Sequence, residues 1–321
     1  MSMAPSLVYA SDHYFAGITT VSLNSMYMNS GLCHANVYVL ADGLSLEDRL
    51  LISSACPSWV VEYVEIRPFL KKVENVGADL TRVPAISAAR LAIDQILPKE
   101  IEQVLYIDSD TFVLDSVEDL FTLDLDGIAI AGVKDLVDSS IKTRIGLLES
   151  SNYINAGVLL INLNVLRDIS FGNKSIELLS KLSKTAKYLD QDAINVLVDG
   201  DKLSLPLEYN LMSANLYFDR DEYCIFRNAS DYYSSEEYEN AIKHPKIIHY
   251  ANSFTFSRPW FSASAHPYAE VFQNTMRRFG VELFGEDSRS KKQRLASKAL
   301  GVVPGALKPY VAKGLRKLND V

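Results

Sequence analysis

Short apolar runs alternate with helical patterns through most of this 321-residue chain. Such alternation is typical of strands separated by crossover helices, so it predicts an α/β fold with a mostly parallel sheet flanked by helices. The predicted strands cover residues 7–10, 36–41, 59–66, 104–108, 128–133 and 156–161. The predicted helices cover residues 16–28, 45–55 with Ser45 as N-cap, about 85–97, 175–186 and 191–198.

The C-terminal part differs in pattern and in charge. After residue 262 only helical patterns remain, at 266–279 and 305–319, with the basic stretch SRSKKQRLASKAL between them. Residues 288–321 contain nine Lys or Arg and one acidic residue, whereas the preceding residues contain 23 basic and 39 acidic ones. We therefore predict a main domain over 1–265 and a basic helical tail over 266–321.

The end of this tail is amphipathic. Its apolar residues fall at helical spacing, at Leu307, Tyr310, Val311, Leu315 and Leu318. A basic amphipathic helix either packs on the protein body with a solvated charged face or lies on an anionic membrane surface, and both interpretations stay open. The acidic main domain is a poor non-specific binder of nucleic acid, so no nucleic-acid partner is expected.

Composition indicates the compartment. No apolar run reaches the 18 or more residues that a membrane helix needs, and the opening MSMAPSLVYASDHY lacks the pattern of a signal peptide. The three cysteines are scattered and odd in number, which argues against a disulfide framework and a zinc knuckle. We expect a cytoplasmic protein, with peripheral contact to the inner face of the membrane if the tail binds lipid.

Two carboxylates stand at the end of an apolar strand. Asp108 and Asp110, in VLYIDSDTFVL, follow the run VLYI, where ligands bind in open α/β sheets. Such a pair can hold a hard divalent cation that bridges nucleotide phosphates. The spacing alone is weak, since loop carboxylates explain three further D-x-D triplets: Asp124/Asp126, Asp199/Asp201 and Asp219/Asp221. Asp190 and Asp192 begin a predicted helix, where N-capping explains them equally well.

Three other residues are candidates for the same site. His249 follows the apolar run KII; alone it is more often a packing residue, but with two carboxylates it would complete a site for Mn²⁺ or Mg²⁺. Arg258, in SRPW, is either a surface cation or a phosphate clamp. Arg90, in SAARLAID, is either a helix-face residue or a contact to a phosphate or sugar.

The order of several segments resembles the family 8 retaining glycosyltransferases, which include bacterial lipopolysaccharide galactosyl- and glucosyltransferases and glycogenin. These segments are VYASDHY, ISAARL, VLYIDSD, YINAGVLLINL, YLDQDAIN and IIHYANSFTFSRPW, and the similarity runs from about residue 7 to residue 260. The resemblance implies a GT-A fold, UDP-glucose or UDP-galactose as the donor, and Mn²⁺. It also implies a glycan acceptor.

The resemblance further implies roles for individual residues. The metal ligands that it implies are Asp108, Asp110 and His249. The residues implied to bind the nucleotide are Ala10, Ser11, Asp12, Tyr14, Asp108 and Ser109. Contacts to the donor sugar or its phosphates are implied for Arg90, Asp135, Asn155, Asp190 and Arg258. Gln191 matches the residue on the face of the anomeric carbon where a double-displacement nucleophile would be expected, and Asp190 and Asp135 are counted with it as catalytic candidates.

The chain departs from the family pattern in two places. The late motif is typically HxxGxxKPW, whereas HYANSFTFSRPW is three residues longer between His and Pro-Trp, lacks the Gly and carries Arg258 in place of Lys. Arg keeps the positive charge and can grip a phosphate with two N–H groups. Ser11 stands where an acidic residue is common, which leaves base and donor preference open.

The first functional hypothesis is a metal-dependent retaining hexosyltransferase that uses a UDP-sugar and a glycan acceptor such as lipopolysaccharide. Because an amide such as Gln191 is a poor nucleophile, we expect front-face attack rather than a covalent glycosyl-enzyme. The alternative is a catalytically inactive sugar-nucleotide or glycan-binding protein of the same fold. A nucleotidyltransferase would usually show a Gly-rich phosphate loop, and residues 7–17 contain none. The hexose, the linkage, the acceptor and the oligomeric state stay open.

Overall fold

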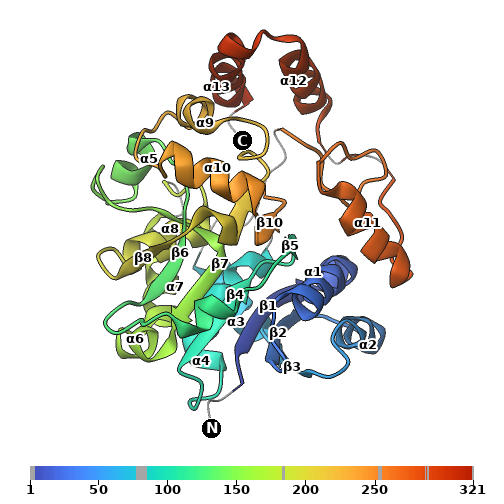
Figure 1. The fold of residues 1–321 in the computed structure, drawn as a ribbon. Coiled ribbons are helices and arrows are strands. Elements are labelled where there is room, and N and C mark those ends of the chain that lie inside the picture. The colour runs from blue at the N-terminus through green and yellow to red at the C-terminus, as the bar shows by residue number, and fades with distance from the viewer. Residues whose placement is uncertain are drawn as a thin grey trace.

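The computed structural model describes residues 4–76, 85–182, 185–251, 255–285, 287 and 289–319. Of these, residues 316–319 are described as backbone only. Its strands are β1 Ser6–Asp12, β2 Asn36–Asp42, β3 Val60–Glu65, β4 Gln103–Ile107, β5 Thr111–Val113, β6 Ile130–Lys134, β7 Ile154–Asn162, β8 Lys202–Leu205, β9 Leu211–Met212 and β10 Ile247–His249. Its α-helices are α1 Ala16–Asn29, α2 Leu46–Ser54, α3 Arg67–Asn75, α4 Ile93–Ile96, α5 Ser139–Arg144, α6 Leu163–Asp168, α7 Phe171–Leu182, α8 Leu189–Leu197, α9 Arg220–Arg227, α10 Ser235–Lys243, α11 Ala269–Arg278, α12 Lys291–Val302 and α13 Lys308–Asn319. Figure 1 shows their arrangement.

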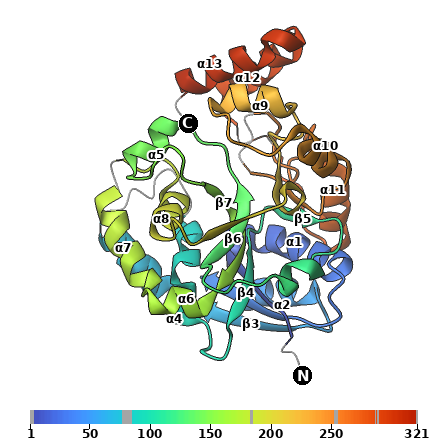
Figure 2. The same ribbon diagram turned by 60° about the vertical axis from the view of Figure 1, so that its left-hand side comes forward.

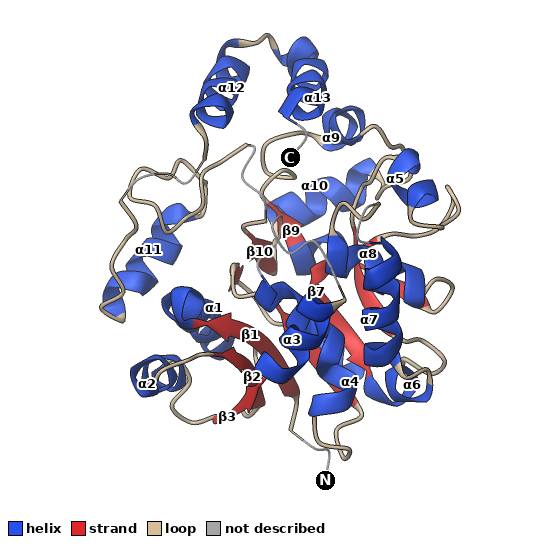
Figure 3. Cartoon of the chain, turned by 180° about the vertical axis from the view of Figure 1, so that it is seen from behind, coloured by secondary structure: helices blue, strands red, loops and turns tan. Residues whose placement is uncertain are grey.

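A seven-stranded sheet forms the centre, in the order β3-β2-β1-β4-β7-β6-β8. The strands β3, β2, β1 and β4 run parallel, β7 is antiparallel to both of its neighbours, and β6 pairs parallel with β8. The predicted mixed, mostly parallel sheet is therefore confirmed. Helices α1 and α2 lie on one face, and α4, α7 and α8 lie on the other (Figures 2 and 3).

Alternating residues of the central strands enter two hydrophobic cores. On β1, Leu7 belongs to the core that includes α1, while Val8 belongs to the core that includes α4 and α8, and both side chains are fully buried. Strand β7 is buried along almost its whole length, as expected of a strand that is covered on both faces. The central strands thus form a rigid frame, and the loops at their ends are held in place by it.

A second, smaller sheet has the order β5-β10-β9. Strand β10 pairs antiparallel with β5, which places His249 opposite Thr111. The backbone N–H of Tyr250 then donates to the carbonyl of Asp110 at 2.9 Å. This small sheet therefore brings the late histidine to the turn between β4 and β5, which contains both aspartates.

Most predicted elements are present. Ser45 caps α2 in a reciprocal box, since its hydroxyl accepts from the N–H of Asp48 and the Asp48 carboxylate accepts from the N–H of Ser45. The predicted helix 85–97 differs in type, because Ala85–Ala92 is a 3₁₀ helix and only α4 is α-helical. The helix expected at 266–279 begins at Ala269, and the one expected at 175–186 begins earlier, at Phe171.

Helices α12 and α13 of the predicted tail pack on the preceding part of the chain through part of their surface. Leu300 of α12 and Ala312 of α13 are buried, and the Lys308 ammonium lies 3.8 Å from the centre of the Tyr217 ring. Other apolar side chains stay exposed, at Leu295, Val302, Leu307, Tyr310 and Val311. Residues 286, 288, 320 and 321 of the predicted tail lie outside the described residues. In the described part of the chain, every helix is too short or too polar to cross a bilayer.

One buried histidine predicts a pH dependence of stability. His266 accepts from the N–H of Tyr268 and contacts the Ser213 hydroxyl, and its ring packs edge-on against Tyr250. Burial lowers the pKa of His266 from 6.5 to about 3. Between about pH 3 and pH 6.5, the unfolded chain therefore binds more protons at this side chain than the folded protein does. The free energy of unfolding thus falls by up to about 1.4 kcal/mol per pH unit as the pH decreases from 6.5. Urea unfolding near pH 7 and about pH 5 should show a smaller difference for His266→Gln than for wild type. Exposed His34→Gln is the control, and equal slopes in all three proteins would contradict the prediction.

Candidate active site at the strand ends

The turn between β4 and β5 forms the base of the site. The backbone N–H of Asp108 donates to the carbonyl of Gly157 on β7 at 2.7 Å. The hydroxyl of Ser109 donates to the carbonyl of Ala10 at the end of β1 at 2.9 Å. Both bonds fix the turn to the central sheet, so its two carboxylates project from a rigid frame.

Asp108, Asp110 and His249 converge on one point. Each offers one ligand atom, and these atoms all lie within 4.8 Å of one another. The His249 Nε2 atom is 3.2 Å from Oδ1 of Asp110 and 3.9 Å from Oδ2 of Asp108. The three residues that the sequence singled out as metal ligands therefore come together in space.

The protonation of His249 suits a metal site. Asn210 donates through its Nδ2 to Oδ1 of Asn155, so the Asn210 Oδ1 atom faces His249 Nδ1 at 2.9 Å and must accept the proton there. The Nε2 lone pair then points at two carboxylates, an arrangement that favours a bound cation. This donor set of two carboxylates and one oriented imidazole fits Mn²⁺ or Mg²⁺.

Arg258 contacts the other oxygen of Asp110, and its guanidinium lies 5.2 Å from the centre of the Trp260 ring. Burial acts to raise the pKa of Asp110, but its interactions with His249 and Arg258 outweigh burial and hold that pKa well below its usual range. The Asp110 carboxylate is therefore ionised whenever the protein is folded near neutral pH.

Arg90 is the buried cation of the site. Its Nη2 lies 2.8 Å from Oδ1 of Asp108, and its Nε lies 3.0 Å from Oδ2 of Asp190. The guanidinium lies over the Tyr106 ring, whose hydroxyl donates to Asp108 at 2.9 Å. Burial raises the pKa of Asp190 to about 6, although the charge of Arg90 acts to lower it. Arg90 thus connects the metal-site carboxylate to the start of α8.

A chain of amides links His249 to Gln191. From Asn210 it continues to Asn155, whose Nδ2 donates to Gln191 Oε1 at 3.1 Å. The same Gln191 oxygen accepts from the Ala156 N–H at 3.1 Å. At its other end, Gln191 Nε2 donates to Oδ2 of Asp135 at 3.2 Å and to the Tyr153 hydroxyl at 3.3 Å. Both ends of the Gln191 amide are therefore held by protein groups.

Asp135 lies between two elements of the main domain. Its Oδ1 atom is 2.9 Å from Nη2 of Arg227 on α9, and its Oδ2 atom faces Gln191 on α8. Both Asp135 and Gln191 are about 9% exposed, so each keeps a small surface that a ligand can reach. The buried ion pair with Arg227 fixes the orientation of the Asp135 carboxylate.

The residues after β1 have mixed environments. The Ser11 side chain is fully buried and accepts from the Thr19 hydroxyl, so its hydroxyl faces the protein interior. Asp12 accepts from the N–H of Phe15 and caps the turn that follows β1. Tyr14 is 67% exposed and the neighbouring His13 is exposed as well, so both side chains of this segment are accessible.

Several site residues were not predicted from the sequence. Tyr106 lies on β4 two residues before Asp108, so the strand pattern already placed its side chain on the same face. Asn210 and Arg227 come from a short 3₁₀ helix and from α9, and no local motif indicated that they reach the site. Gly157 lies close to His249. It stands in the segment YINAGVLLINL, which the sequence analysis quoted without giving this glycine a role.

The arrangement as a whole suits a phosphorylated sugar. Two arginines and a carboxylate–histidine cluster stand at one end, where they can receive a diphosphate. Buried carboxylates and amides stand at the other end, where they can exchange hydrogen bonds with hydroxyl groups. Arg90 and Asp190 connect the two ends.

Known proteins are similar to this chain in sequence and in fold. The chain is 26% identical over 270 residues to glycosyltransferase GlyB of Streptococcus pneumoniae, which covers 83% of this chain and 60% of GlyB. It is 28% identical over 188 residues to the lipopolysaccharide 1,2-glucosyltransferase of Escherichia coli K12, which covers 57% of this chain and 52% of that protein. The chain thus spans about half to three fifths of the length of these curated relatives.

A solved structure of the galactosyltransferase LgtC, in complex with donor and acceptor sugar analogues, matches with a TM-score of 0.71. The match has 22% identity and covers 85% of this chain and 95% of that one, which confirms the predicted GT-A fold. The model of the family described as Glycosyl transferase family 8 matches residues 6–264. The chain therefore belongs to glycosyltransferase family 8.

Proposed function

We propose that this protein transfers glucose or galactose from a UDP-sugar to a glycan acceptor and retains the anomeric configuration. The observation that carries the proposal is one continuous cluster, in which Asp108 of the carboxylate–histidine set is bound by Arg90, and Arg90 is bound by Asp190 beside Gln191. Lipopolysaccharide or another surface polysaccharide is the acceptor class that we propose, since one relative carries that name.

Asp108, Asp110 and His249 would hold Mn²⁺ or Mg²⁺. Such an ion, when bound, would neutralise charge on the donor diphosphate and on the departing UDP. Arg258, which contacts Asp110 of this cluster, would bind a phosphate oxygen as negative charge develops on it. Arg90 would contact the donor at the point where its phosphates join its sugar.

Gln191 is the residue at the position where a nucleophile would be expected, but the hydrogen bonds of its amide argue against that role. Its oxygen accepts two hydrogen bonds and its nitrogen donates two, so the amide is fixed as a hydrogen-bonding group. We therefore propose front-face attack: the acceptor oxygen bonds to the anomeric carbon on the face from which UDP departs. The bond to the phosphate oxygen breaks, and that oxygen takes the proton of the acceptor hydroxyl.

The test is UDP release from a panel of UDP-hexoses, measured with Mn²⁺ and with EDTA. Metal-dependent release from one donor is the expected result, and it names the hexose. UDP binding with metal but without turnover of any donor, even with glycan acceptors present, would favour a catalytically inactive binding protein. A covalent sugar adduct on Gln191, Asp190 or Asp135, detected by mass spectrometry, would contradict front-face attack.

We also propose that the tail contacts an anionic membrane surface on the cytoplasmic side. The exposed Leu295, Leu307 and Tyr310 combine with the basic residues of the tail, a combination that favours an interfacial position. Replacing these three residues by Ser should weaken binding to phosphatidylglycerol liposomes by about tenfold or more. The matched control replaces Leu46 and Leu50, which are equally exposed on α2. Equal liposome binding of the tail variant and the control would contradict the proposal.

A further inference from the structure

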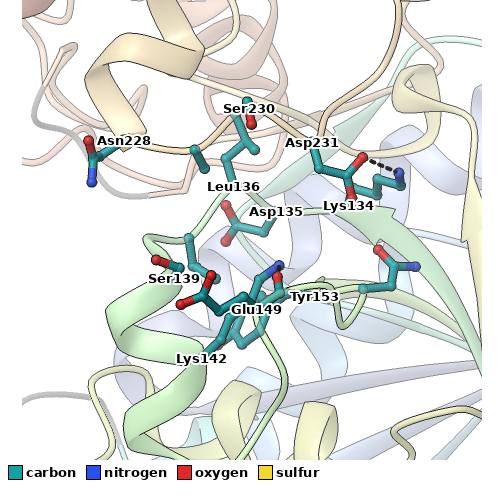
Figure 4. Close-up of a pocket in the computed structure, with 13 residues that line it drawn as sticks. Lys134, Asp135, Leu136, Ser139, Lys142, Glu149, Tyr153, Asn228, Ser230 and Asp231 are labelled. Atoms are coloured by element: carbon teal, nitrogen blue, oxygen red, sulfur yellow. Dashed lines mark hydrogen bonds and ion pairs between the residues drawn. The ribbon is translucent and has the colours of Figure 1, made fainter.

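A separate pocket adjoins the candidate active site at Asp135. Its volume is about 270 Å³, and it is lined by the end of β6, by α5, by the loop before β7 and by the loop after α9. Figure 4 shows Asp135 in the middle, with the Lys134–Asp231 ion pair on one side and Asn228 on the other. Asp135 and Tyr153 line this pocket and both also accept a hydrogen bond from Gln191, so the two sites share these side chains.

The walls of this Asp135 pocket present both hydrogen-bond donors and acceptors. The Lys142 ammonium donates to the carbonyls of Glu149 at 3.0 Å and of Ser151 at 2.7 Å, and it carries three protons. In the described part of the chain, no carboxylate forms an ion pair with Lys142, so its third proton is available to a ligand. The carboxylate of Glu149 and the hydroxyl of Ser139 complete this end of the pocket.

The charges and the size of the pocket restrict the ligand. Two lysines face three carboxylates, so the lining is close to balanced and does not select an anion such as a phosphate. Mixed donors and acceptors of this kind suit the hydroxyl groups of a neutral sugar. The volume lies just below the ~300–1,000 Å³ of pockets for drug-sized molecules, so it suits a single sugar residue better than a nucleotide.

We propose that the Asp135 pocket holds a neutral sugar residue of the acceptor glycan. This assignment rests on the proposed function, because it places the acceptor beside the donor sugar. Asp135 lines the pocket and its Oδ2 accepts from Gln191, so a sugar in the pocket and a sugar at Gln191 would meet at one carboxylate. The rim of the pocket also contacts the tail, since Lys313 of α13 donates to Asn228 at 2.6 Å.

The test fills the pocket without disturbing the core. Ser139 lines the pocket and Ser140 does not, although both are exposed in the first turn of α5. Ser139→Trp and the matched Ser140→Trp are compared with wild type in the presence of the UDP-hexose that is turned over and Mn²⁺. The acceptor probes are lactose, maltose, cellobiose and methyl α-mannoside, and mass spectrometry separates transfer to the saccharide from hydrolysis by water.

The expected result is specific to one position. In Ser139→Trp the ratio of transfer to hydrolysis should fall about tenfold and the acceptor KM should rise, while Ser140→Trp stays within about twofold of wild type. Wild-type behaviour of Ser139→Trp, or an equal loss in both variants, would overturn the assignment. Donor turnover without transfer to any of the saccharides would overturn it as well, whereas absence of all donor turnover would refute the proposed function and the pocket together.

Discussion

Asp110→Asn should lower metal-dependent UDP release by about 10³-fold, equivalent to about 4 kcal/mol. The substitution keeps the shape of the side chain but removes the charge that faces His249 at 3.2 Å and contacts Arg258. A divalent cation bound as we propose would lose one of its two charged ligands, and Arg258 would lose the carboxylate that holds it in the site. UDP release and Mn²⁺ binding by calorimetry should fall together.

The matched control is Asp126→Asn, in another D-x-D triplet on an exposed turn. That variant should keep wild-type turnover and metal affinity, because the Asp126 carboxylate lies on an exposed turn and not beside His249 and Arg258. Thermal unfolding of both variants shows whether a loss of activity comes from a loss of structure. Retention of metal-stimulated turnover in Asp110→Asn to within about tenfold would contradict the assignment of Asp110 as a ligand.

The parts of the site that could be predicted are those with a local pattern. Asp108 and Asp110 come directly after the apolar strand β4, and His249 ends the apolar strand β10, and strand ends are where ligands bind in α/β folds. Asn210 and Arg227 have no such pattern, because their contacts with His249 and Asp135 depend on how the chain returns after β8. Tertiary contacts of this kind have no signature in neighbouring residues.

The same limit applies to the secondary structure. Strands β5 and β9 have three and two residues, which is too short for an alternating pattern to appear. Helix α9 did have a signal, a capping box in which Asp219 and Glu222 satisfy each other's backbone N–H. We interpreted Asp219 with Asp221 as a loop triplet, and the structure corrects this, since Asp219 is the N-cap of a helix.

Gly157→Ala should lower the affinity for Mn²⁺ by about 100-fold, and UDP release with it. A Cβ atom at residue 157 would lie 2.2 Å from Cε1 and 2.7 Å from Nδ1 of His249, and 3.0 Å from Oδ2 of Asp108. His249 cannot move aside easily, because Asn210 holds its ring and β10 holds its backbone. One methyl group therefore displaces two of the three ligand side chains, although it adds no charge.

Gly132→Ala is the control for the cost of adding a methyl group inside the sheet. A Cβ at residue 132 would lie 3.0 Å from Leu159 and 3.1 Å from Ile154, so it crowds the core and costs about 1–3 kcal/mol of stability without touching a ligand. Calorimetric Mn²⁺ titration and thermal unfolding of both variants separate the two effects. A Gly157→Ala protein that binds Mn²⁺ as tightly as Gly132→Ala would show that the ion does not use His249. A Gly157→Ala protein that is no less stable but has lost the ion would show that the space beside His249 is needed for metal binding rather than for folding.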